Sequence, residues 1–151
     1  MQVSARGDYA VRAALTLAAA YPATVSAQAL ATEQQMPRKF LEAILADLRR
    51  AGVVQSTRGV DGGYTLSKPP GEVMVGQILR AVDGPLAGVR GQRPEETAYP
   101  GAAQHLPHLW VAVRASVRRV LDEVSLAELV RGRLPAHVRR LLADHEAWQS
   151  R

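Results

Sequence analysis

The order of elements in the first 67 residues constrains the fold of this chain most. A stretch over 8–20 repeats apolar residues at helical spacing and contains no internal Gly or Pro. Ser26 is placed to cap a short second helix that ends near Gln34, and Pro37 to open a third helix that Gly52 ends. Two alternating stretches, 53–57 and 64–67, flank a glycine-rich turn and indicate a β-hairpin. The pattern predicts a helix-turn-helix followed by a wing.

The third predicted helix has one apolar and one polar face. The expected buried stripe is Phe40, Leu41, Ile44, Leu45 and Leu48, and the outward face carries Arg38, Lys39, Glu42, Ala43, Ala46, Asp47 and Arg49. In winged helix-turn-helix proteins this helix enters the major groove of DNA with its N-terminal residues nearest the bases. Arg38 and Lys39 lie there, and Glu42 is placed to accept a hydrogen bond from cytosine N4. An ordinary solvated helix face explains these three residues equally well.

The wing supplies the strongest single candidate for DNA contact. Arg58 and Gly59 begin its turn, and a guanidinium on a hairpin tip suits a narrow minor groove. The alternative is a surface arginine in a turn. Arg6 and Ser26 are candidates for phosphate contacts, although helix capping alone explains Ser26.

The second half of the chain predicts a dimerisation helix. A fourth helix over 75–82 is followed by a loop over 87–104 that has no periodicity and collects Gly, Pro and charge. An apolar seam then runs through Leu106, Trp110, Val113, Val117, Val120 and Val124. Such a seam packs along another helix, and we expect its last five residues to form a homodimer interface. A capping box at Ser125 and a final amphipathic helix after Pro135, reaching Trp148, complete the prediction.

Composition and charge narrow the function classes. The formal net charge is +5, and all but two of the 19 basic residues are arginines, which favours a polyanionic partner such as double-stranded DNA. Neither a membrane span nor a secretory leader is expected, which predicts a cytoplasmic protein without a membrane partner. The sequence has no nucleophile–base arrangement and no nucleotide-binding motif, so we do not expect an enzyme.

Cofactor ligands are scarce in this sequence. It contains no cysteine, which excludes thiolate ligation of zinc or iron–sulfur clusters. The remaining metal-like group is Glu95, Glu96, His105 and His108, in which no third or fourth ligand has convincing spacing. Incidental surface histidines are the favoured interpretation, and no cofactor is expected.

The residues resemble those of the Rrf2-type bacterial regulators from residue 3 to about 130. The stretches that carry the resemblance are 3–13, 40–54 and the wing at 56–64, with weaker agreement at 83–86, 109–110 and 125–129. The resemblance implies a two-fold symmetric regulator on a roughly palindromic operator. It also implies DNA contacts at Arg6, Arg38, Lys39, Glu42 and Arg58, which agrees with the choice made from chemistry.

The resemblance fails at the family's cluster ligands. Members that bind an iron–sulfur cluster place three cysteines in the loop after the fourth helix, where this chain has Gly91, Ala98 and Gln104. A variant branch uses a Glu in the first helix and a His in the second, near Asp8 and Glu33 here. The effector is therefore left open between a small molecule in the loop, a protein partner and none.

The expected fold is mainly α with a small β-hairpin wing, a winged helix-turn-helix domain plus a long dimerisation helix. We expect the DNA-binding domain over 1–84, a cysteine-free effector loop over 85–105, dimerisation and short helices over 106–131, and a C-terminal helical extension over 132–151. The predicted function is a sequence-specific, homodimeric transcriptional regulator that acts as a repressor. Two alternatives stay open: a winged-helix module that binds another protein, and a metal sensor using His105 and His108.

Overall fold

The computed structural model describes residues 2–150, so the outer ends of the first and last predicted segments, Met1 and Arg151, lie outside the described residues. The helices are α1 (Ala5–Ala20), α2 (Ala27–Gln34), α3 (Arg38–Arg50), α4 (Val75–Asp83), α5 (Leu106–Leu121), α6 (Leu126–Arg131) and α7 (Ala136–Leu142). Strands β1 (Val54–Thr57) and β2 (Gly63–Leu66) pair antiparallel, with Val54 opposite Leu66. Short 3-10 turns lie at Pro70–Glu72, Pro94–Glu96, Gly101–Ala103 and His145–Trp148. The predicted mainly helical fold with a hairpin wing is confirmed.

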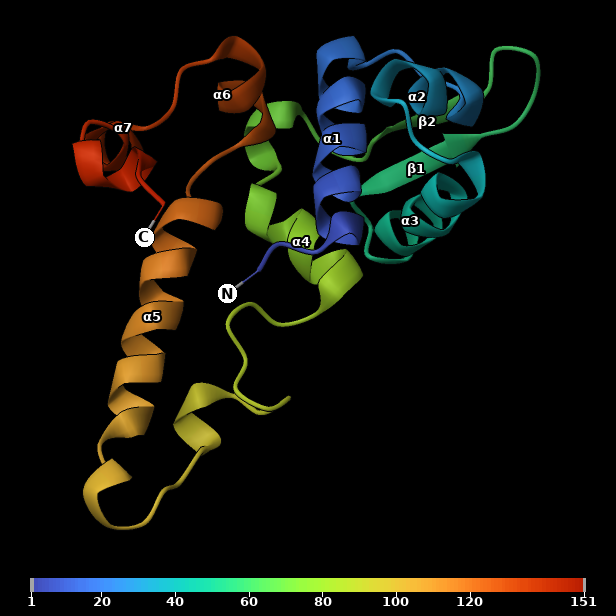
Figure 1. Ribbon diagram of the computed structural model, residues 1–151. Helices are drawn as coiled ribbons and strands as arrows, with labels where there is room; N and C mark the ends of the chain where they lie inside the picture. Colours follow the sequence, from blue (N-terminus) through green and yellow to red (C-terminus); the bar gives the residue numbers. More distant parts are fainter. Residues whose placement is uncertain (1, 151) are drawn as a thin grey trace.

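The body of the molecule is built around α1. Figure 1 shows α2, α3 and the hairpin on one side of α1 and α4 on the other, while α5 stands away from this body as an arm. The largest fully buried side chains of the body are Leu17, Leu30, Leu41, Ile44, Leu45, Leu48, Leu66, Ile78 and Leu126. Small residues along α1, among them Ala10, Ala13 and Ala14, are completely buried and let its neighbours approach closely. One apolar core therefore fixes the helix-turn-helix, the wing and α4 together.

Two ends of the arm are joined to the body. The chain leaves the body after α4 at Gly84 and returns beyond α5, where Val75 N–H donates to the Val124 carbonyl at 3.0 Å and Leu126 N–H to the Val73 carbonyl at 2.9 Å. Leu126 then enters the main core, fully buried. Arg80 on α4 also donates two hydrogen bonds, at 2.7 and 2.6 Å, to Asp122 just past α5. The arm is thus an excursion between α4 and α6.

Four details differ from the sequence-based expectation. The first helix begins at Ala5, three residues early, because the Ser4 hydroxyl caps it by accepting from Gly7 N–H at 2.8 Å. Pro37 is the N-cap of α3 and not its first helical residue. The final helix ends at Leu142, and Asp144 caps a separate turn that contains Trp148. The fourth difference, at Val124, is described with the arm below. None of the helices within residues 2–150 is long and apolar enough to cross a membrane.

Candidate DNA interface

The outward face of α3 is polar, as predicted. Four apolar side chains of the helix, Leu41, Ile44, Leu45 and Leu48, are fully buried. Arg38, Lys39 and Glu42 lie on the exposed side. Phe40 is only partly buried and contacts the Tyr9 ring edge-on, with the ring centroids 5.4 Å apart. The helix is therefore anchored by its inner face and leaves its N-terminal polar residues accessible to a partner.

Arg38 and Lys39 differ in how they are held. Arg38 Nε donates to Glu42 Oε1 at 3.0 Å, and its Nη1 donates to Gln28 Oε1 on α2 at 2.9 Å. The side chains of Arg38 and Glu42 are 55% and 49% exposed, so their ion pair is weak and easily opened. Lys39 makes no side-chain hydrogen bond or ion pair within residues 2–150. A phosphate or base can thus approach Lys39 without displacing a partner.

The wing presents a second free cation. Arg58 follows β1 directly, is exposed, and has no side-chain partner in the described part of the chain. Gly59, next in the turn, has φ of 112°, a conformation that side-chain-bearing residues avoid. Val60 at the tip is fully exposed. The tip therefore offers a guanidinium on a turn that only glycine adopts readily.

The wing is fixed to the helix-turn-helix at several points. Val25, just before α2, exchanges backbone hydrogen bonds with Tyr64 of β2 at 2.9 and 2.8 Å. A Cβ on Gly63 would lie 2.6 Å from the Val25 carbonyl oxygen, so this approach requires glycine. Arg49 Nη1, at the end of α3, donates to Ser56 Oγ on β1 at 3.3 Å. The recognition helix and the wing are consequently held as one surface, and Arg49 has a contact that helix-dipole reasoning did not reveal.

The two predicted phosphate contacts outside α3 and the wing have structural roles. The Ser26 hydroxyl caps α2 by accepting from Ala29 N–H at 3.1 Å, which confirms the cap. Arg6 forms an ion pair with Asp47, which also accepts from Arg50 at 2.8 Å. The Asp47 side chain is only 17% exposed, so its placement on the outward face of α3 was wrong. Phosphate contact at Arg6 and Ser26 stays a prediction.

The arm carries the predicted apolar seam over most of its length. None of the residues of α5 is buried, and Leu109 and Val113 are 54% and 37% exposed. Trp110, Val117 and Val120 are half-buried. The seam was wrong at Val124, which lies beyond the end of α5 and is buried, 4% exposed, against Val75 of its own chain. The seam therefore ends at Val120, and Val124 anchors the arm instead of pairing it.

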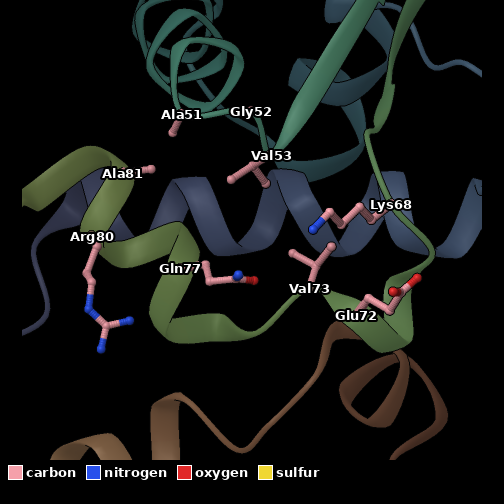
Figure 2. Close-up of a pocket in the computed structure, with 9 residues that line it drawn as sticks. All are labelled: Ala51, Gly52, Val53, Lys68, Glu72, Val73, Gln77, Arg80 and Ala81. Carbon is pink, nitrogen blue, oxygen red and sulfur yellow. The ribbon is translucent and has the colours of Figure 1, made fainter.

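Two hollows lie away from the α3 and wing surface. One, of about 430 Å³, is lined by Ala51, Gly52, Val53, Lys68, Glu72, Val73, Gln77, Arg80 and Ala81 (Figure 2). It brings a lysine and a glutamate together, and its Gln77 side chain already accepts from Met74 N–H at 2.9 Å. In Figure 2 the Arg80 guanidinium extends away from Lys68 and Glu72, and it pairs with Asp122. This hollow therefore has no surplus charge, whereas the second, described below, does.

Comparison with known proteins decides the family. The family model of the iron-dependent transcriptional regulators, Rrf2, matches residues 3–132. The chain belongs to the Rrf2 family. A proposed HTH-type transcriptional regulator of Mycobacterium tuberculosis is 43% identical over 99% of this chain and 94% of its own length. The Rrf2 family thus makes this chain a DNA-binding transcriptional regulator of the winged-helix kind.

Solved structures agree with that assignment. CymR, the global cysteine regulator of B. subtilis, superposes with a TM-score of 0.75 at 28% identity, over 87% of this chain and 98% of that one. IscR of T. potens gives a TM-score of 0.71 at 29% identity, over 100% and 93% of the two chains. These two Rrf2-family proteins are regulators, and so is the mycobacterial relative. The similarity covers the arm and the body alike.

The side chains present do not fit an iron–sulfur cluster, although the Rrf2 family is described as iron-dependent. The sequence has no cysteine, and residues 2–150 contain no group of three metal-ligating side chains. Asp8 accepts from Arg12 at 3.3 Å, and Glu33 accepts from Thr16 at 3.1 Å. His105 and His108 stack with ring centroids 6.0 Å apart, while Glu95 pairs with Arg114. The donor chemistry of this chain therefore differs from that of a cluster site.

Proposed function

We propose that this Rrf2-family protein is a transcriptional repressor that binds a palindromic operator sequence-specifically as a homodimer. The observation that carries the proposal is the pair of unpartnered cations, Lys39 on α3 and Arg58 on the wing, within one rigidly joined surface. A helix end of this kind reads base edges in the major groove, and a wing arginine suits the adjacent minor groove. A dimer bound across a promoter then excludes the polymerase.

The apolar seam of α5 supports the homodimer. Leu109, Trp110, Val113, Val117 and Val120 line a helix that buries none of its residues in its own chain. Contiguous apolar surface of this kind is costly in water and marks an association site. Two-fold packing of α5 on a second α5 removes that surface from water and places two α3 helices on one face, as a palindrome requires.

The DNA-binding part is tested by removing the wing cation. The operator is first selected from a random-sequence DNA pool, and binding is then followed by fluorescence anisotropy over a series of salt concentrations. Arg58→Ala should weaken binding and reduce the slope of log K against log salt by about one unit for the lost phosphate-proximal charge. Repression is read from in vitro transcription of a template that carries the selected operator.

A matched variant controls for net charge. Arg139→Ala removes the same charge from exposed α7, away from α3 and the wing, and should leave affinity and salt slope unchanged. Equal slopes for the parent protein and Arg58→Ala would refute the wing contact. Failure to select any DNA sequence, together with co-purification of a single protein, would favour the alternative of a protein-interaction module.

The homodimer is tested by placing a charge in the seam. Val113→Glu buries a carboxylate in the proposed interface and should convert the dimer to a monomer in sedimentation equilibrium. Ala115→Glu adds the same charge to the same helix about 200° further round, outside the seam, and should leave the dimer intact. A parent protein that sediments as a monomer at micromolar concentration would rule the homodimer out.

We further propose that the protein works without an iron–sulfur cluster. The support is the donor chemistry, since oxygen and imidazole groups remain where thiolates are needed. Anaerobically purified, tag-free protein should show no visible charge-transfer band and no stoichiometric iron. If metal is found, His105→Ala with His108→Ala decides the metal-sensor alternative, because loss of the metal would establish it.

A further inference from the structure

A pocket of about 710 Å³ lies between the end of α4, the loop that follows it and α5. Its lining includes four arginines, Arg80, Arg93, Arg114 and Arg118, and two carboxylates, Asp83 and Glu95. The formal charge of these six side chains is therefore +2. The volume lies in the range of sites for small metabolites. This concentration of positive charge on a concave surface needs an explanation other than packing.

The pocket does not belong to the DNA surface. In Figure 1 the start of the loop, the end of α4 and α5 lie on the side of α1 opposite to α2, α3 and the wing. Duplex DNA seated on α3 and the wing therefore does not reach these arginines. A concave site also suits a small molecule better than it suits the outside of a duplex.

The arginines of the pocket are not equally available. Arg80 is committed to Asp122, and the hydrogen bonds from Asp122 raise the pKa of Arg80. Arg114 is 14% exposed and pairs with Glu95, whose own backbone amide and then Arg114 lower the pKa of Glu95. Arg118, one helical turn beyond Arg114, has no side-chain partner within residues 2–150. An unpaired guanidinium thus lies one turn from a paired one along the wall of the pocket.

We propose that this pocket binds a small dianion, with the two anionic groups held by Arg118 and Arg114. Guanidinium groups bind carboxylate and phosphate oxygens in a bidentate manner, and such charge-assisted hydrogen bonds are the strong ones. Two negative charges match the surplus of +2. Glu95 competes with the ligand for Arg114, so the site is weaker than its arginines alone would make it.

The test is isothermal titration calorimetry of the full chain at constant ionic strength, with succinate and inorganic pyrophosphate as probes and acetate as the monovalent comparison. The dianions should bind at least about tenfold more tightly than acetate. Arg118→Gln should weaken dianion binding about tenfold or more through the loss of a charge-assisted hydrogen bond. Arg119→Gln removes the same charge from the neighbouring exposed residue, which is outside the pocket lining, and should leave binding unchanged.

A gain of affinity provides a second arm that a misfolded variant cannot imitate. Glu95→Gln frees Arg114 and should tighten dianion binding severalfold. Equal weakening by Arg118→Gln and Arg119→Gln would show general attraction to a basic protein and overturn the proposal, as would the absence of binding by both dianions at millimolar concentration. No DNA is present, so this result is independent of the operator experiment.

Discussion

The body and the arm of this protein obtain their stability in different ways. The body, from α1 to α4, surrounds a core in which several side chains are completely buried, whereas α5 buries none of its residues. Hydrophobic burial within one chain accounts for the first and cannot account for the second. A helix of α5's length with an apolar seam is marginal alone in water and needs a partner surface. The comparison teaches that the DNA-reading part folds on its own core while the arm depends on association.

The largest expected effect separates these two sources of stability. Leu45→Ala in α3 empties fully buried space and should cost about 2–5 kcal/mol of unfolding free energy at every protein concentration. Leu109→Ala truncates a side chain that is 54% exposed in the single chain. Its cost should be within ~0.5 kcal/mol at concentrations where the protein is monomeric and rise where it is dimeric.

Denaturant melts at two protein concentrations measure both variants. A Leu109→Ala cost that is independent of concentration would contradict the assignment of α5 to association. A Leu45→Ala cost below that of Leu109→Ala at low concentration would contradict the division between body and arm.

The same division explains what the sequence predicted well. Caps, glycine stops and apolar periodicity are local signals, and in the body they coincide with the core, so α2, α3 and the hairpin lie where they were expected. Lys39 and Arg58 were found because exposed cations at a helix start and in a turn are visible in the pattern. Their freedom from partners is a tertiary property and needed the structure.

The errors arose where tertiary contacts override local pattern. The seam spacing continues through Val124, but the chain turns after Leu121 and Val124 packs on α4. Asp47 reads as an outward polar residue, yet Arg6 from α1 reaches it. The dianion pocket combines α4, the loop and α5, and Arg118 within it resembles any solvated helix residue in sequence. Neither ion pairs between distant elements nor pockets leave a periodic signal.

An intermediate effect tests how rigidly the wing belongs to the body. Gly63→Ala places a Cβ 2.6 Å from the backbone oxygen of Val25, which cannot move away as a side chain can. The clash should cost about 1–3 kcal/mol and also weaken operator binding, because it separates the wing from α2. Gly71→Ala is the control, since nothing lies within 4 Å of its added Cβ. Equal thermal stability and DNA affinity of the two variants would show that the wing moves independently.

The smallest expected effect concerns the joint between body and arm. Arg80 and Asp122 bond through two pairs of atoms, at 2.7 and 2.6 Å, but their side chains are 33% and 34% exposed, so solvent screens much of the attraction. A double-mutant cycle with Arg80→Gln and Asp122→Asn should give a coupling energy of up to about 1 kcal/mol. The same cycle with Arg38→Gln and Glu42→Gln on α3 should give about 0.3–0.5 kcal/mol, because that pair is single, more exposed and within one helix. Coupling at the joint that does not exceed the α3 value would mean that the return of the chain through Val124 and Leu126, and not the ion pair, sets the position of the arm.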